Sequence, residues 1–115
     1  MPLCDLTPAQ KAIVHQAMRL CAERADLFPD WEFQTIFGVT RPQMAQLVAQ
    51  WPDLDDQTEG PARWAVNNAM NNLLGYPHKH HDDWDSHFPF GARDLFETFC
   101  AWRGDRPGSY FDGLA

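Results

Sequence analysis

Apolar and polar side chains follow one another along this chain mainly at the three- and four-residue spacing of an α-helix. The clearest case surrounds Val66, whose side of the helix also carries Ala62, Ala69, Met70 and Leu73. Two-residue alternation, the pattern of a half-buried strand, is nearly absent. The spacing therefore predicts five helices, at residues 8–25, 31–37, 41–51, 62–74 and 91–103.

The ends of these stretches carry residues that cap or break helices. Thr7 and Thr40 are each followed three residues later by glutamine, which is the pattern of a capping box. Gly38 suits the left-handed conformation that closes the end of a helix. The predicted fold is all-α: a single compact domain of about five helices over residues 1–104, with a C-terminal tail at 105–115 and a long ordered loop, rich in histidine and aspartate, before the last helix.

Residues 31–50 resemble a helix-turn-helix, a motif of many DNA-binding proteins. Gly38 stands in the turn, and apolar residues take the packing positions of the second helix. The resemblance departs from the pattern at Gln34, where the first helix normally carries a small residue. The exposed side of the second helix offers Arg41 as its one phosphate-neutralising charge. Because DNA affinity rests largely on such charges, a DNA-binding regulator is the weaker alternative, and nucleic acid is not an expected partner.

The helix around Val66 has an unusual outward face. Trp64, Asn68 and Asn71 point away from its apolar side, and Asn72 flanks them. Asparagine is a poor helix former, so the asparagines of this helix together cost about 1 to 2 kcal/mol relative to alanine. Two explanations stay open: the amides hydrogen-bond to another part of the fold, or the face is a contact surface for a partner.

The segment 77–89 shows neither a helical nor a strand period and contains four of the five histidines. If it is extended, two of these imidazoles point to the same side, and a third can fold back to join them. The candidate metal ligands are three imidazoles and one carboxylate: His78, His80 and His87, with Asp83 or Asp85. This set suits zinc or nickel, because imidazole favours both metals. Ordinary polar loop residues are the alternative, since the segment lacks HExxH spacing or paired cysteines. No other cofactor is expected.

The charge of the chain indicates the kind of partner it would meet. Nine basic and sixteen acidic residues give a net charge of −7, which attracts basic protein surfaces by long-range steering. Acidic residues and an aromatic anchor stand together in the histidine-rich segment. The predicted contact residues for a protein partner with a basic surface are Trp64, Asn68, Asn71, Asn72, Asp83, Trp84 and Asp85.

Several classes of protein are not indicated. The chain has no apolar run long enough to span a membrane, no export signal and none of the common catalytic fingerprints. Three cysteines without a CxxC pair suit a reducing compartment. We therefore expect a small, acidic, cytoplasmic protein-interaction module that is not an enzyme, most concretely an inhibitor or immunity-type protein that covers the basic active site of a toxin or nuclease. A zinc- or nickel-binding protein that uses residues 78–87 is the first alternative.

Overall fold

The computed structural model describes residues 1–104, which form six α-helices and one short 3-10 helix. These elements are η1 (Leu3–Asp5), α1 (Pro8–Glu23), α2 (Asp30–Phe37), α3 (Arg41–Gln50), α4 (Pro61–Gly75), α5 (Trp84–His87) and α6 (Ala92–Arg103). The all-α prediction is confirmed, and the five predicted helices correspond to α1, α2, α3, α4 and α6. The pattern did not predict α5, and the predicted tail at 105–115 lies outside the described residues.

Two helices begin with the capping boxes that the sequence predicts. At α1, the Thr7 hydroxyl accepts the Gln10 amide at 3.1 Å, and the Gln10 side chain accepts the Thr7 amide at 3.0 Å. Thr40 and Gln43 form the same pair at α3, at 3.2 and 2.8 Å. These bonds satisfy amides that the first turn of a helix leaves without a partner, so they fix where both helices start.

Gly38 ends α2 and also lets this helix approach α4. Its φ of 77° lies in the left-handed region, which side chains strain to adopt. A Cβ atom at this position would stand only 3.3 Å from the Cβ atom of Trp64 on α4. The turn of the helix-turn-helix pattern is therefore also a contact point between α2 and α4.

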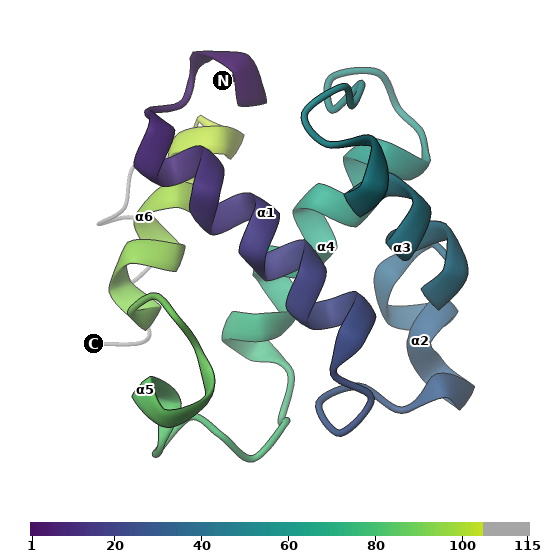
Figure 1. Cartoon of the computed structure of the whole chain (residues 1–115), viewed down its shortest axis with the longest axis vertical. Coiled ribbons are helices and arrows are strands. Elements are labelled where there is room, and N and C mark those ends of the chain that lie inside the picture. Colours follow the sequence, from purple (N-terminus) through teal and green to yellow (C-terminus); the bar gives the residue numbers. More distant parts are fainter. Residues whose placement is uncertain (105–115) are drawn as a thin grey trace.

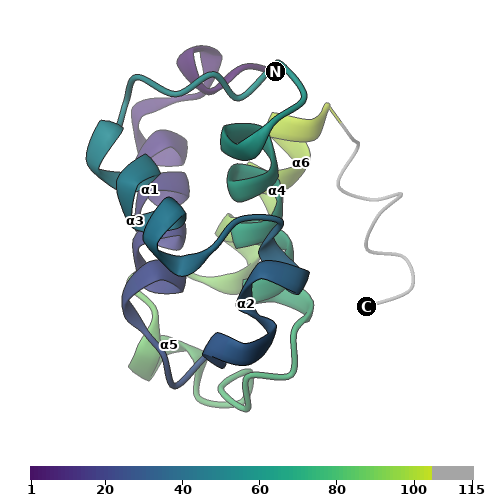
Figure 2. The same cartoon turned by 90° about the vertical axis from the view of Figure 1, so that its right-hand side faces the viewer.

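Helix α1 lies at the centre of the fold. It packs against α3, α4 and α6, and in Figure 1 it crosses the molecule diagonally between α6 and α3, with α4 behind it. Figure 2 shows α1 and α3 on one side of the molecule and α4 and α6 on the other. The fully buried side chains of α1 are Val14, Ala17, Met18 and Cys21. Burial of this stripe is what drives α1 into the interior.

A buried carboxylate joins the N-terminal segment, the α3–α4 connection and α6. Asp56 is only 6% exposed, although it stands in an acidic stretch of the sequence. Its Oδ2 atom accepts hydrogen bonds from the Leu3 amide at 2.9 Å, the Gln57 side chain at 2.8 Å and the Trp102 indole at 2.8 Å. Because a buried charge needs such donors, Asp56 serves the fold and not the acidic surface.

Arg41 is turned into the fold, which corrects its predicted place on an exposed recognition surface. Its Nη1 atom donates to the carbonyls of Cys21 and Ala22 at 3.0 and 3.1 Å, near the end of α1. Its Nη2 atom donates to the Phe28 carbonyl at 2.6 Å, and its Nε atom to Asp30 at 2.7 Å. The one charge on which the DNA-binding alternative relied is therefore already used within the protein.

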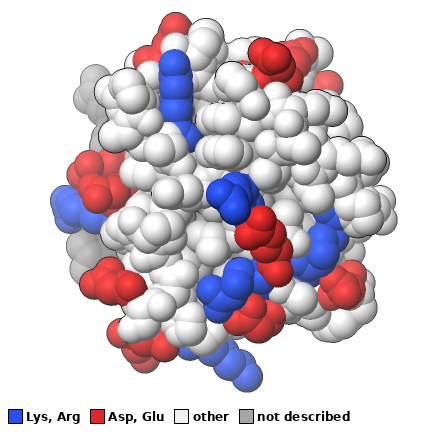
Figure 3. Space-filling view, in the orientation of Figure 1, with Lys and Arg blue, Asp and Glu red and all other residues white. Residues whose placement is uncertain are grey.

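The charged side chains do not gather into one acidic patch on the face shown in Figure 3. Basic and acidic groups lie there in mixed clusters, separated by wide uncharged areas. Such mixing accords with ion pairs one helical turn apart, for example Arg19 with Glu23 at 3.5 Å. Within residues 1–104, none of the helices combines the length and the apolar character needed to cross a bilayer.

Candidate metal-binding site

His78 fastens the α4–α6 connection to the core. Its ring is 4% exposed, its Nε2 atom lies 2.8 Å from the Leu73 carbonyl, and its Nδ1 atom accepts the His80 amide at 3.2 Å. Because a carbonyl only accepts, the ring proton lies on Nε2, so both nitrogens are used. Burial holds the pKa of His78 below its ordinary value.

His78 is therefore not part of the metal site that the sequence predicted. That prediction assumed an extended segment in which His78 and His80 face the same way. Lys79 instead adopts a left-handed backbone with φ of 72°, so the chain turns between the two histidines. One imidazole enters the core and the other joins a separate group of side chains.

The other three predicted ligands come together. One ligand atom each from His80, Asp83 and His87 lies within 4.8 Å of the other two. Asp83 is central to this group: its Oδ1 atom is 3.4 Å from His80 Nδ1, and its Oδ2 atom is 3.0 Å from His87 Nε2. Helix α5 produces this geometry, because Asp83 directly precedes it and His87 ends it, one turn away on the same face.

His80 contributes a ring nitrogen whose bonding is incomplete. Its Nδ1 atom is buried and forms no hydrogen bond with any residue that the structure describes. Its separation of 3.4 Å from Asp83 Oδ1 does not have the geometry of a hydrogen bond. Buried polar atoms are nearly always satisfied, so this nitrogen is suited to an additional partner.

The α1–α2 connection adds two residues that the sequence did not point to. In Figures 1 and 2 this connection and α5 lie at the same end of the molecule. Arg24 donates to Asp26 at 2.8 and 2.6 Å and approaches His87 Nδ1 at 3.2 Å. Asp26 Oδ2 also lies 3.9 Å from His80 Nε2. Nothing in the local sequence shows that residues more than fifty positions apart meet here.

Both carboxylates of this region favour the ionised form. The hydrogen bonds from Arg24 lower the pKa of Asp26 to about 2. Burial alone would raise the pKa of Asp83, but the hydrogen bond and charge of His87 outweigh this effect and hold that pKa below its ordinary value. Metal ligands have to be deprotonated, so both groups are ready to act as ligands at neutral pH.

The donor set and its spacing fit a borderline divalent metal. Two imidazoles and one carboxylate are ligands that zinc and nickel accept. A tetrahedral metal with bonds of about 2.1 Å needs ligand atoms about 3.4 Å apart. The two separations that involve Asp83, 3.4 and 3.0 Å, are near this value, whereas the group as a whole has to contract from 4.8 Å.

The asparagines of α4 are divided between the fold and the surface. Asn68 donates to the Phe37 carbonyl at 2.9 Å, and Asn72 donates to the Ile36 carbonyl at 2.9 Å. Both acceptors belong to the last turn of α2, whose carbonyls lack partners within their own helix. Asn68 and Asn72 thus tie α2 to α4. Both are half-buried, whereas Asn71, the third predicted amide contact, is exposed.

Trp84, which the sequence predicted as an aromatic anchor for a partner, is buried in the core. It is 7% exposed, and its ring packs against Phe88 with ring centroids 4.3 Å apart. Its indole nitrogen donates to the Phe90 carbonyl at 2.7 Å. Its acidic neighbours Asp83 and Asp85 are exposed, and so is Trp64, at 38%.

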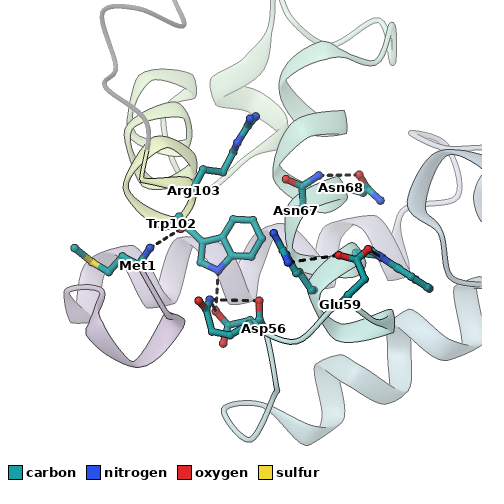
Figure 4. Close-up of a pocket in the computed structure, with 10 residues that line it drawn as sticks. Met1, Asp56, Glu59, Asn67, Asn68, Trp102 and Arg103 are labelled. Atoms are coloured by element: carbon teal, nitrogen blue, oxygen red, sulfur yellow. Dashed lines mark hydrogen bonds and ion pairs between the residues drawn. The ribbon is translucent and has the colours of Figure 1, made fainter.

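A polar cleft of about 620 Å³ lies between the start of α4, the loop before it and the end of α6. Figure 4 shows the Trp102 indole in this cleft, with Asp56 below it and with Asn67 and Asn68 on the α4 side. Asn67 donates to Asn68 at 3.0 Å, and Glu59 accepts the Trp64 indole at 2.6 Å. Polar groups of the cleft thus bond to one another, whereas the histidine cluster retains an unsatisfied buried nitrogen.

Comparisons with known proteins give no further guide to this site. No family model, no curated protein and no solved structure matches the chain.

Proposed function

We propose that this protein binds a divalent transition metal, zinc or nickel, through His80, Asp83 and His87. The observation that carries the proposal is the buried Nδ1 atom of His80, which lies beside two other ligand-type side chains without a hydrogen bond. A bound metal would supply the partner that this nitrogen lacks.

The proposed role of the metal is to fasten α5 to the segment that precedes it. His80 lies before α5, whereas Asp83 and His87 stand at its two ends. The unfolded chain does not hold these groups together, so metal binding adds to the stability of the folded state. At free metal about 100 times the dissociation constant the gain is about 2.7 kcal/mol. For a chain of this size, such a gain raises the melting temperature by about 10 °C.

The test compares two histidines of the same loop. His81 is the matched control for His80, because it is exposed, contacts the Tyr76 carbonyl and does not belong to the cluster. The untagged wild type should carry close to one zinc or nickel per chain in elemental analysis, and a chelator should lower its melting temperature. His80→Ala should lose both the metal and the response to chelator, whereas His81→Ala should keep them.

The proposal would be rejected by a wild-type protein that stays metal-free after incubation with zinc and nickel and melts at the same temperature with and without them. Equal losses in His80→Ala and His81→Ala would also reject it, because they would indicate unspecific binding by exposed imidazoles.

The expectation of an inhibitor that covers a basic active site stays a prediction. Its support is weaker than the sequence suggested, because Asn68, Asn72 and Trp84 are engaged in the fold.

A further inference from the structure

Arg24 contacts one ligand of the proposed metal and a carboxylate that lies beside another. Its guanidinium makes two hydrogen bonds to the Asp26 carboxylate, at 2.8 and 2.6 Å. The same group reaches across to the α4–α6 connection, where its Nη2 atom is 3.2 Å from Nδ1 of His87. A cation that belongs to the chain is thus in contact with one imidazole of the site and with a carboxylate next to the site.

The contact with Arg24 determines which nitrogen of His87 carries the proton. A guanidinium has donors only, so Nδ1 of His87 must accept from it. The ring proton of neutral His87 then lies on Nε2, where it donates to Asp83 Oδ2 at 3.0 Å. In this state neither nitrogen of His87 has a lone pair free for a metal.

Metal binding through His87 therefore requires Arg24 to leave, whichever nitrogen is the ligand. A metal on Nε2 moves the ring proton to Nδ1, and this proton would then face a guanidinium donor at 3.2 Å. A metal on Nδ1 would have to take the position of the guanidinium itself. Departure of Arg24 also releases Asp26, whose Oδ2 atom lies 3.9 Å from His80 Nε2.

We propose that the Arg24 guanidinium, held against Nδ1 of His87, opposes metal binding through the Asp83-facing side of the same ring, and that a divalent cation binds only when Arg24 moves away. This inference rests on the proposed function and names the residue that regulates the affinity of the site. Arg24 opposes the metal in two ways: it is a donor where the His87 ring needs an acceptor, and it is a positive charge beside the incoming cation.

The inference predicts opposite effects of one substitution on stability and on affinity. Arg24→Gln removes the charge and offers an oxygen that can accept the Nδ1 proton of His87. Zinc affinity should rise at least about 10-fold, because the substitution removes a positive charge beside the incoming cation. The metal-free variant should melt below the metal-free wild type, because the bonds from Arg24 to Asp26 and His87 are lost.

Arg19→Gln is the matched control for the loss of charge. Arg19 lies on α1, its side chain is 53% exposed, and it pairs with Glu23. Arg19→Gln therefore removes the same charge without a change at the site. Zinc binding to the wild type, Arg24→Gln and Arg19→Gln is measured by competition with a coloured chelator, and all three proteins are melted without metal. Arg19→Gln should bind zinc as the wild type does.

The outcomes separate this inference from the proposed function. Zinc affinity of a folded Arg24→Gln that equals or falls below that of the wild type and Arg19→Gln would overturn the inference and leave the metal site standing. Zinc binding by Arg24→Gln alone would support the inference and remove metal binding as a function of the wild type. Absence of zinc binding in all three proteins would reject both proposals.

A second variant serves if Arg24→Gln does not fold. Arg24→Lys keeps the charge, but its single ammonium cannot reproduce the contacts with both Asp26 and His87. Its zinc affinity should lie above that of the wild type, and an unchanged affinity would overturn the inference.

Discussion

Asn72 and Asn71 are adjacent on α4, and the structure predicts that their replacement by alanine has opposite effects. Asn72 donates to the Ile36 and Asn68 carbonyls, each at 2.9 Å, whereas Asn71 is exposed. Asn72→Ala should lower the free energy of unfolding by about 1 to 2 kcal/mol, because these carbonyls lose a donor. Asn71→Ala should raise it by about 0.5 kcal/mol through better helix propensity. Urea unfolding measures both, and equal values would show that the bonds from Asn72 do not stabilise the fold.

The asparagines of α4 also show which contacts of a single residue can be predicted from the sequence and which cannot. The helix-propensity cost of the α4 asparagines indicates that their amides serve some partner, within the fold or outside it. The acceptors of Asn68 and Asn72 lie over thirty positions earlier in the chain, in the last turn of α2. Which explanation holds therefore depends on how α2 docks against α4, and periodicity within one helix carries no information on docking.

At the scale of elements, α5 is held in place by Trp84. The ring is buried against Phe88, and the indole donates to the Phe90 carbonyl at 2.7 Å. Trp84→Ala should lower the free energy of unfolding by about 3 to 5 kcal/mol, which is typical of a large aromatic lost from a core. Asp85→Ala, at the exposed next position, should change it by no more than about 0.5 kcal/mol. Similar thermal melts for the two variants would mean that α5 does not depend on its tryptophan.

The helices differ in how well they can be predicted from the sequence. α1 and α3 combine a capping box with an apolar stripe, so both their existence and their first residues are predictable. α5 has four residues, about one turn, which is too short to display a period, and its first turn has no side-chain cap. Its formation follows from burial of Trp84, a tertiary effect. The left-handed backbone conformation of Lys79, before α5, could not be predicted from the sequence either, because lysine has no preference for that conformation.

At the scale of the whole molecule, some residues of the site and its surroundings could be predicted from the sequence and others could not. The histidines and aspartates of one loop were enough to predict His78, His80, Asp83 and His87 as ligands, of which the last three come together. Arg24 and Asp26 reach the same place only because α1 and α4 pack together and bring their connections to one end of the molecule. Such a meeting is set by the packing of helices, which a single sequence does not reveal.

The three cysteines report on the integrity of the whole fold. Cys4 is exposed, whereas Cys21 and Cys100 are buried in the core, and burial raises the pKa of the Cys21 thiol above its ordinary value. Because the thiolate is the reactive form, we expect a disulfide reagent such as DTNB to label Cys4 at once and the two buried thiols only as the molecule opens. The native protein should thus show one fast equivalent of labelling, and the denatured protein three. Cys4→Ser should abolish the fast phase and leave the slow one. A second fast equivalent in the native wild type would mean that the core around α1 opens far more readily than its packing implies.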